Sequence, residues 1–181
     1  YAYLDEVFEA VIRSAGMPVD VMLAPRVDNN VVDRLAAWGI HGYSINIEVY
    51  DEQIAAKIAP QKYHLGHKNY AKAISRAVEN VGTTGRVRSL ILVGLEPIES
   101  TLAGVEFLAK LGCDPVLSPF RPAAGTPLEN TPPPTPELME CIYLGAKDIV
   151  ERYGVKLGPR CIPCQHNTLT LPDNSGAYYY S

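Results

Sequence analysis

The sequence predicts an α/β fold built on a parallel β-sheet, because strand and helix patterns alternate along the whole chain. The 181 residues are enough for one domain with a substantial core, and 47% of them are hydrophobic, as in ordinary globular proteins. Short apolar runs alternate with stretches in which apolar residues have helical spacing. No break in composition divides the chain. The alternation therefore indicates repeated βα units.

Five stretches carry apolar residues at the three- and four-residue spacing of an amphipathic helix. They cover 4–11, 31–38, 70–81, 102–108 and 135–153. Each ends close to a glycine, the residue that most easily adopts the left-handed conformation that closes a helix. The last stretch also opens with Thr135 and Pro136, a favoured N-cap followed by a favoured first helical residue.

Four apolar runs between these helices predict strands at 19–24, 43–48, 86–93 and 114–118. The continuous apolar segment 90–93 suits a strand that is buried on both faces. One more short strand is expected around 168–171. Parallel strands joined by helices form either an open doubly wound sheet or a barrel, and spacing alone does not decide between them.

A full eight-stranded barrel needs about 200 to 250 residues, so a barrel made by this chain would be partial. Its exposed sheet edges would have to be covered by a partner chain or by a missing N-terminal half. We expect residues 1–156 to form the partial barrel and residues 157–181 to form a C-terminal extension.

Charge and hydropathy exclude two classes of partner. The net charge is -4, with acidic and basic residues mixed along the chain, so no basic stripe suits a nucleic acid. No apolar run approaches the roughly 20 residues that span a bilayer, and the first nine residues are amphipathic and acidic, unlike a signal sequence. We expect a cytoplasmic protein. Its four cysteines are few for a disulfide scaffold and fit reduced thiols or metal ligands better.

The predicted strand 43–48 carries the first candidate binding residues. Alternation would direct Asn46 and Glu48 to one face and isoleucines to the other. In a barrel, the polar face would line the lumen, and both residues would lie at the C-terminal end of the strand, where such barrels bind ligands. A carboxylate beside an amide suits a diol such as ribose. The alternative is an edge strand with a solvated face.

The segment 93–97 follows a buried strand and precedes a helix. Gly94 would let a ligand approach the backbone closely, and the helix N-terminus would favour an anionic group. The alternative is a tight βα turn in which Glu96 complements the helix dipole. The next such loop, 118–128, contains Arg121, which is either a ligand for a carboxylate or phosphate at the barrel mouth or an ordinary surface residue.

Residues Cys161, Cys164 and His166 fall within six positions of a predicted loop. A Cys-x-x-Cys turn followed by histidine can bind zinc or iron, although a closed tetrahedral site needs one more ligand. Cys113, Cys141 or a group outside this chain could supply it. The alternative is a pair of reduced cysteines packed near one end of the barrel.

Taken in order, three segments resemble elements of the radical S-adenosylmethionine (SAM) enzymes, in their biotin synthase-like group. Residues 46–48 resemble that group's Asn-Leu-Asp element on the fourth barrel strand. Residues 92–96 resemble its Ile-x-Gly-Leu-Gly-Glu element after the fifth strand, with one residue fewer here. Residues 119–128 resemble the sixth-strand loop that ends in Gly-Thr-Pro-Leu. The resemblance covers about 19–153 and implies a partial TIM-type (β/α) barrel with parallel strands three to six of a radical SAM core, followed by a C-terminal tail.

The resemblance also implies roles for the candidate residues. Asn46 and Glu48 would hold the ribose of SAM. Val93 and Gly94 would flank its adenine, and Glu96 would belong to the same cofactor-binding element. Arg121 would face a small-molecule substrate. Cys161, Cys164 and His166 would be free to bind an additional metal or cluster, as some members of the family do.

In that family, a reduced 4Fe-4S cluster splits SAM to a 5'-deoxyadenosyl radical, which abstracts hydrogen from the substrate. Three cysteines in a Cys-x-x-x-Cys-x-x-Cys loop hold the cluster, and the sequence lacks this loop. Cys161 and Cys164 follow the sixth strand and have the wrong spacing to replace it. We expect the loop to lie upstream in a longer enzyme or in a partner chain, and we expect this chain alone not to cleave SAM.

Three other functions compete with this one. A non-catalytic half-barrel that binds a nucleotide-like ligand or a partner chain predicts SAM binding without dependence on iron. An aldolase-like barrel needs a Schiff-base lysine at a strand end, whereas Lys62 and Lys68 fall in loop or helix-start positions. A small metal-binding module around 161–166 would leave the long βα pattern without a purpose.

Overall fold

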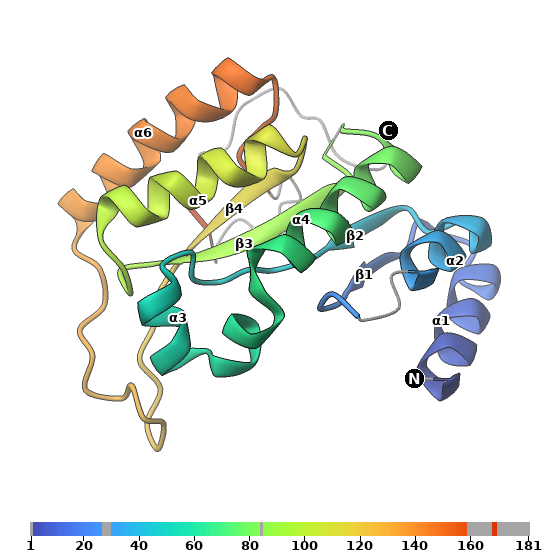
Figure 1. Ribbon diagram of the computed structural model, residues 1–181, viewed down its shortest axis with the longest axis horizontal. Coiled ribbons are helices and arrows are strands. Elements are labelled where there is room, and N and C mark those ends of the chain that lie inside the picture. Colours follow the sequence, from blue (N-terminus) through green and yellow to red (C-terminus); the bar gives the residue numbers. More distant parts are fainter. Residues whose placement is uncertain (1, 27–29, 84, 159–167, 170–181) are drawn as a thin grey trace.

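The computed structural model describes residues 2–26, 30–83, 85–158 and 168–169. Four parallel strands form one sheet in the order β1-β2-β3-β4 (Figure 1). The strands are β1 Asp20–Met22, β2 Gly42–Ser44, β3 Val87–Val93 and β4 Asp114–Pro119. The predicted α/β fold with a parallel sheet is therefore confirmed, and the sheet is consistent with part of a TIM-type barrel.

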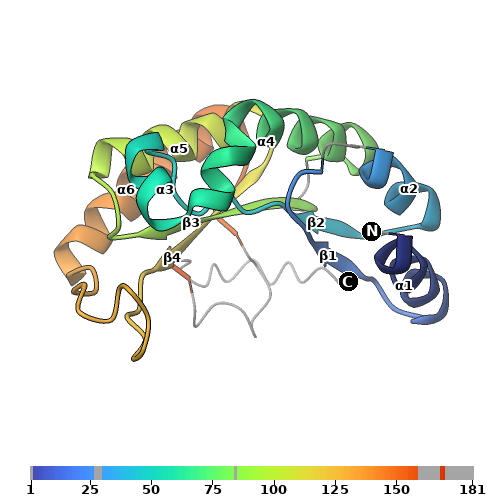
Figure 2. The same ribbon diagram turned by 60° about the horizontal axis from the view of Figure 1, so that its bottom comes forward.

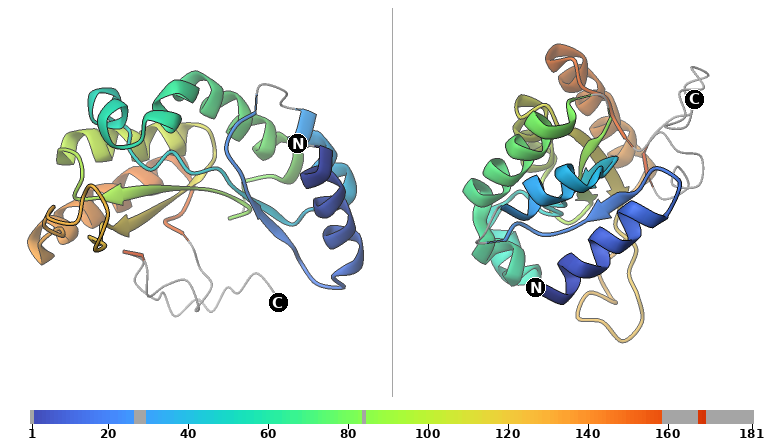
Figure 3. Two further views of the ribbon diagram at one scale, coloured as in Figure 1. Left: turned by 90° about the horizontal axis from the view of Figure 1, so that it is seen from below. Right: turned by 90° about the vertical axis from the view of Figure 1, so that its right-hand side faces the viewer.

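Six helices accompany the sheet in the described residues. They are α1 Ala2–Ser14, α2 Asn30–Trp38, α3 Glu52–Ile58, α4 Pro60–Val81, α5 Ile98–Lys110 and α6 Pro136–Tyr153. The sheet is curved, and α3, α4, α5 and α6 lie together on its convex side (Figures 2 and 3). None of the helices in the described ranges combines the length and the apolar character of a membrane span.

The helix ends follow the predicted chemistry. Thr135 caps α6 by accepting a hydrogen bond from the Leu138 N–H, Pro136 opens the helix, and Gly154 closes it in the left-handed conformation. The sequence prediction missed α3 altogether and began α4 at residue 70, ten residues late. The reason is Gly66, whose non-helical backbone kinks α4 and interrupts its periodicity.

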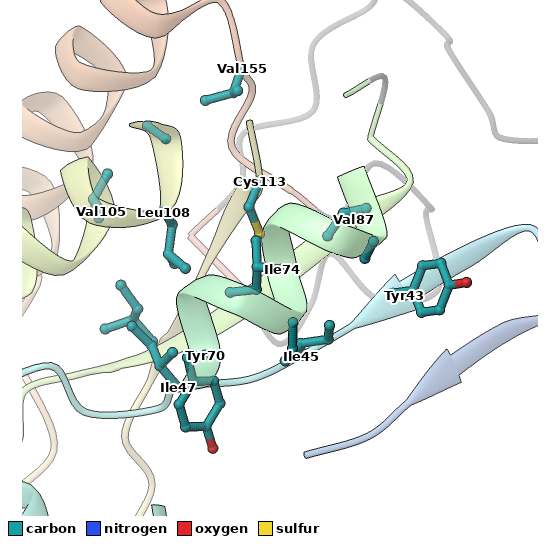
Figure 4. Packing of buried hydrophobic residues seen from close by; sticks show 14 of the residues in the cluster. Tyr43, Ile45, Ile47, Tyr70, Ile74, Val87, Val105, Leu108, Cys113 and Val155 are labelled. Atoms are coloured by element: carbon teal, nitrogen blue, oxygen red, sulfur yellow. The ribbon is translucent and has the colours of Figure 1, made fainter. Parts of the chain in front are cut away.

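The core lies between the sheet and the helices. Side chains that are less than 2% exposed come from strands and helices alike: Tyr43, Ile91, Leu117, Tyr70, Ile74, Leu108 and Ile142. Figure 4 shows α4 residues among those of the strands within one cluster. Each buried aliphatic or aromatic side chain contributes roughly 1.5 to 3 kcal/mol relative to an exposed one, so this layer fixes the sheet beneath the helices.

The opposite face of the sheet carries polar residues. Register places Ser44, Arg88 and Asp114 side by side on neighbouring strands, and Arg88 forms an ion pair with Asp20 of β1. Arg88 is 9% exposed and Asp114 is 1% exposed. Buried charges on the face away from the helices agree with a barrel lumen better than with a hydrophobic layer.

Two predicted strands are shorter than expected, and β2 lies between β1 and β3 instead of at an edge of the sheet. The strand expected at 19–24 pairs only over 20–22, and the strand expected at 43–48 is interrupted after Ser44. At the other edge, residues 168 and 169 form a bend, and the Leu169 N–H donates to the Leu117 carbonyl at 2.8 Å. The proposed division at residue 157 stays a prediction.

Candidate functional site

The interruption of β2 is a β-bulge at residues 45–48, called the β2 bulge from here on. The Ile45 N–H donates to the Arg88 carbonyl and the Glu48 N–H donates to the Leu90 carbonyl, each at 2.8 Å. Three steps along one strand therefore match two steps along β3. Pairing resumes at Glu48, which bridges Ile91. Bulges of this kind redirect side chains at the ends of strands.

Side chains satisfy the backbone groups that the β2 bulge leaves unpaired. The Leu90 N–H donates to Asn46 Oδ1 at 3.1 Å, and the Ile47 N–H donates to Ser89 Oγ at 3.1 Å. Asn46 is 7% exposed, and its Oδ1 also accepts from the Ser44 hydroxyl at 2.9 Å. The structure therefore places the predicted ribose residue Asn46 within the sheet, where its amide oxygen is already used.

Glu48 has an unusual backbone conformation. Its φ is 65°, and every other residue with positive φ in the described part of the chain is glycine. This conformation costs about 1 to 2 kcal/mol for a residue with a side chain. Two hydrogen bonds with β3 hold this conformation. The Glu48 N–H donates to the Leu90 carbonyl, and the Glu48 carbonyl accepts from the Leu92 N–H, each at 2.8 Å. Strain of this kind is typical of functional sites, and it occurs here at the C-terminal edge of a parallel sheet.

Lys62, in the first turn of α4, contacts the β2 bulge at two residues. Its Nζ lies 3.0 Å from Glu48 Oε1 and donates to the Asn46 carbonyl at 2.8 Å. The side chains of Lys62 and Glu48 are 26% and 33% exposed. The sequence prediction considered Lys62 only as a Schiff-base lysine. Pro60, a favoured first helical residue, was the signal that could have placed it on a helix beside the strand end.

A small pocket of about 10 Å³ lies beside Lys62, between the end of β2 and the first half of α4. That volume suits about one water molecule. Tyr70 lines it and is 2% exposed, and its hydroxyl has no hydrogen-bond partner among the described residues. Burial raises the pKa of this hydroxyl far above its usual value. His67 lines the same pocket and stacks on Tyr50.

Glu96 joins the turn after β3 to the loop after Glu48. Its Oε2 accepts from the Tyr50 N–H at 2.9 Å and from the Asp51 N–H at 2.7 Å. Its Oε1 accepts from the Thr101 hydroxyl at 3.3 Å. Burial raises the pKa of the Glu96 carboxyl above its usual value, and the hydrogen bonds from Asp51, Tyr50 and Thr101 oppose that rise. Asp51 in turn caps α3, so Glu96 holds the start of that helix.

Gly94 adopts a φ of 100°, and a Cβ there would lie 2.9 Å from Pro134 Cβ. The close approach that the sequence predicts at this glycine is therefore made by the chain's own segment before α6. Val93 is fully buried in the core, so its backbone rather than its side chain faces the edge of the sheet.

Arg121 follows β4, on the same edge of the sheet as Glu48 and Gly94. The Phe120 N–H donates to the Val93 carbonyl at 2.9 Å, which aligns the ends of β3 and β4. Arg121 itself is exposed. Parallel pairing thus brings the predicted residues of three strands to one edge.

The predicted metal ligands Cys161, Cys164 and His166 lie outside the described residues. Within the described part of the chain, Cys113 is buried and Cys141 is exposed, and no group of three or more His, Cys, Asp or Glu side chains could hold a metal ion. Burial raises the pKa of the Cys113 thiol well above its usual value, which makes it a poor source of thiolate.

No family model matches the chain, and no curated protein matches it in sequence. Among solved structures, it is similar to coproporphyrinogen III oxidase (HemN) from Escherichia coli, described as a radical SAM enzyme. The TM-score is 0.62 and the sequence identity is 17%. The chain shares its fold with a radical SAM enzyme. The match covers 84% of this chain and 37% of the HemN chain, so it corresponds to a part of that structure.

Proposed function

We propose that this chain is part of a radical SAM enzyme and binds SAM at the C-terminal edge of the β1–β4 sheet. Two independent observations support the proposal. The first is the fold shared with HemN. The second, which carries most weight, is Glu48: a strained, partly exposed carboxylate at the strand end where the sequence resembles a ribose-binding element.

The residues fit the nucleoside part of SAM. The Glu48 carboxylate would accept hydrogen bonds from the ribose hydroxyls, since each of its oxygens has two lone pairs. Asn46 would support this contact from within the sheet. The backbone at Val93 and Gly94 would flank the adenine, and Glu96 would hold the adjoining loop in place. Arg121 would bind an acidic group of a small-molecule substrate.

When bound, SAM and a reduced 4Fe-4S cluster supply radical chemistry that abstracts hydrogen from the substrate. The ligands of that cluster would lie outside this sequence. The order of the three motif segments further supports membership of the biotin synthase-like group. A cytoplasmic location is part of the same proposal. Cys161, Cys164 and His166 would bind an additional metal or cluster.

The side of the sheet formed by β1, at one end of the strand order, would be covered by a missing N-terminal half of the barrel or by a partner chain. Large exposed apolar side chains are concentrated near this edge, on α1 and around β1: Tyr3, Leu4, Val7, Val11, Met17 and Met22. A concentration of this kind is typical of a surface that is covered in the complete protein.

The first test is calorimetric binding of adenosine and of 2',3'-dideoxyadenosine, which lacks the ribose diol. Wild type should prefer adenosine, and Glu48→Gln should reduce adenosine affinity by about 10- to 100-fold, the usual effect of weakening hydrogen bonds to a charged group. Glu140→Gln, at an exposed position on α6, is the matched control. Equal affinity for both nucleosides, or no binding of either, would overturn the ribose site.

Iron dependence separates the enzyme from a non-catalytic half-barrel. The full-length natural protein, reconstituted anaerobically, should take up a 4Fe-4S cluster, in addition to any metal on Cys161, Cys164 and His166, and bind SAM more tightly than adenosine. SAM binding that is the same with and without iron would favour the non-catalytic alternative.

A further inference from the structure

We infer that Lys62 is a positioning residue, which holds the Glu48 carboxylate and the β2 bulge in the arrangement that receives a ribose diol. This inference rests on the proposed function and adds a residue that the sequence motifs do not contain. Lys62 lies on α4, fourteen positions after Glu48 in the sequence, and meets it only in the folded chain.

Lys62 completes the hydrogen bonds around the β2 bulge. The bulge disrupts the strand ladder, and Asn46 and Ser89 side chains take the N–H groups of Leu90 and Ile47. The Asn46 carbonyl is left on the same disrupted stretch, and Lys62 Nζ donates to it. A buried carbonyl without a donor would cost about as much as a lost hydrogen bond. Lys62 is thus part of the structure that keeps the bulge.

Lys62 also restrains the Glu48 carboxylate. Nζ lies 3.0 Å from Oε1, and the Glu48 side chain is 33% exposed. The ion pair holds the carboxylate in place and leaves part of it open to a ligand. A flexible glutamate would have to lose rotamer freedom on binding, and a restrained one has already lost it.

The first turns of α4 are set apart from the rest of the helix at this contact. Pro60 opens the helix, and the Lys62 N–H donates to the Ala59 carbonyl at 2.9 Å. Four residues later, Gly66 turns the helix with a φ of 69°. This break separates the first turns of α4, which carry Lys62, from the later turns that pack in the core through Tyr70 and Ile74.

The test compares Lys62→Met with Lys68→Met, an exposed lysine on the same helix. Lys62→Met should weaken adenosine binding by about tenfold, a coupling within the usual range for contacting side chains. It should leave 2',3'-dideoxyadenosine binding unchanged, because that ligand has no diol for Glu48. Lys68→Met should bind both nucleosides like wild type.

A double-mutant cycle separates positioning from a general loss of structure. If Lys62 acts through Glu48, Lys62→Met in the Glu48→Gln background should cause no further loss of adenosine affinity. SAM provides a second check. If Lys62 bound the carboxylate of SAM directly, Lys62→Met would weaken the binding of SAM but not that of adenosine. Two results would overturn the inference. One is that Lys62→Met weakens binding of SAM but not of adenosine, and the other is that the losses of adenosine affinity in the double mutant are fully additive.

The two proposals fail in different ways. If wild type binds adenosine through its diol and Glu48→Gln weakens it, but Lys62→Met binds like wild type, only the role of Lys62 is wrong. If wild type shows no dependence on the diol, the ribose site is wrong, and the role of Lys62 falls with it.

Discussion

The two halves of the sheet differ in regularity. β3 and β4 pair from Arg88 with Asp114 to Val93 with Pro119, without interruption. β1 and β2 are three residues long each, and β2 breaks into the bulge that ends at Glu48. The regular half is covered by α5 and α6, whereas α1, beside β1, has no fully buried residue. The regular half pairs without a break, and the irregular half carries the candidate binding carboxylate.

The largest expected effect contrasts the two halves by truncating one side chain in each. Ile91→Ala removes a fully buried side chain of β3 and should lower the free energy of unfolding by about 2 to 5 kcal/mol. Val7→Ala, on the exposed face of α1, should change it by less than about 0.5 kcal/mol. Urea unfolding measures both. A large loss for Val7→Ala would show that α1 packs more closely than described.

A smaller effect is expected at the junction of the two halves. Asn46→Ala removes the acceptor of the Leu90 N–H and should cost about 1 to 3 kcal/mol of unfolding free energy, the penalty for a buried unpaired donor. Amide hydrogen exchange should show loss of protection at Leu90 in particular. Unchanged protection there would mean that another group takes the bond.

Tyr70→Phe should have a small effect of the opposite sign. The buried hydroxyl lacks a partner in the described residues, so its removal should raise the free energy of unfolding by about 1 kcal/mol. Thermal unfolding at neutral pH is sufficient to detect this. Destabilisation instead would indicate that a water molecule in the adjoining pocket bonds the hydroxyl.

The smallest expected effect is a pH dependence at Glu96, which links the halves. Because burial raises its pKa in the folded state, its contribution favours folding below the usual glutamate pKa and is lost as the pH rises through the higher folded pKa. Glu96→Gln cannot ionise. The free energy of unfolding of Glu96→Gln should therefore increase relative to that of wild type as the pH rises from the usual glutamate pKa to the higher folded pKa. A difference that is constant with pH would contradict the raised pKa.

The sequence predicted the regular half of the sheet well. Residues 90–93 form a continuous apolar run, and the helices after β3 and β4 have clear periodicity and clear ends at Gly112 and Gly154. Local pattern suffices there, because each element makes the contacts that its own spacing predicts.

The irregular half was harder to predict for a physical reason. Alternation along 43–48 reads as an unbroken strand, and only its register against β3 reveals the extra residue. The bonds from Asn46 to Leu90 and from Lys62 to Glu48 join positions far apart in the chain, so no local pattern contains them. The sequence predicted that the candidate residues lie together at one edge of the sheet. It did not predict which of them already use their polar atoms in hydrogen bonds within the fold.

The Glu96 contact also matters for recombining barrel units between proteins. Its carboxylate anchors two backbone N–H groups of a different βα unit, the one that begins with β2. A chimera joined between α4 and β3 would therefore take Glu96 from one parent and the loop after β2 from the other. Chimeras should fold more reliably if the loop after β2 and the turn after β3 come from the same parent.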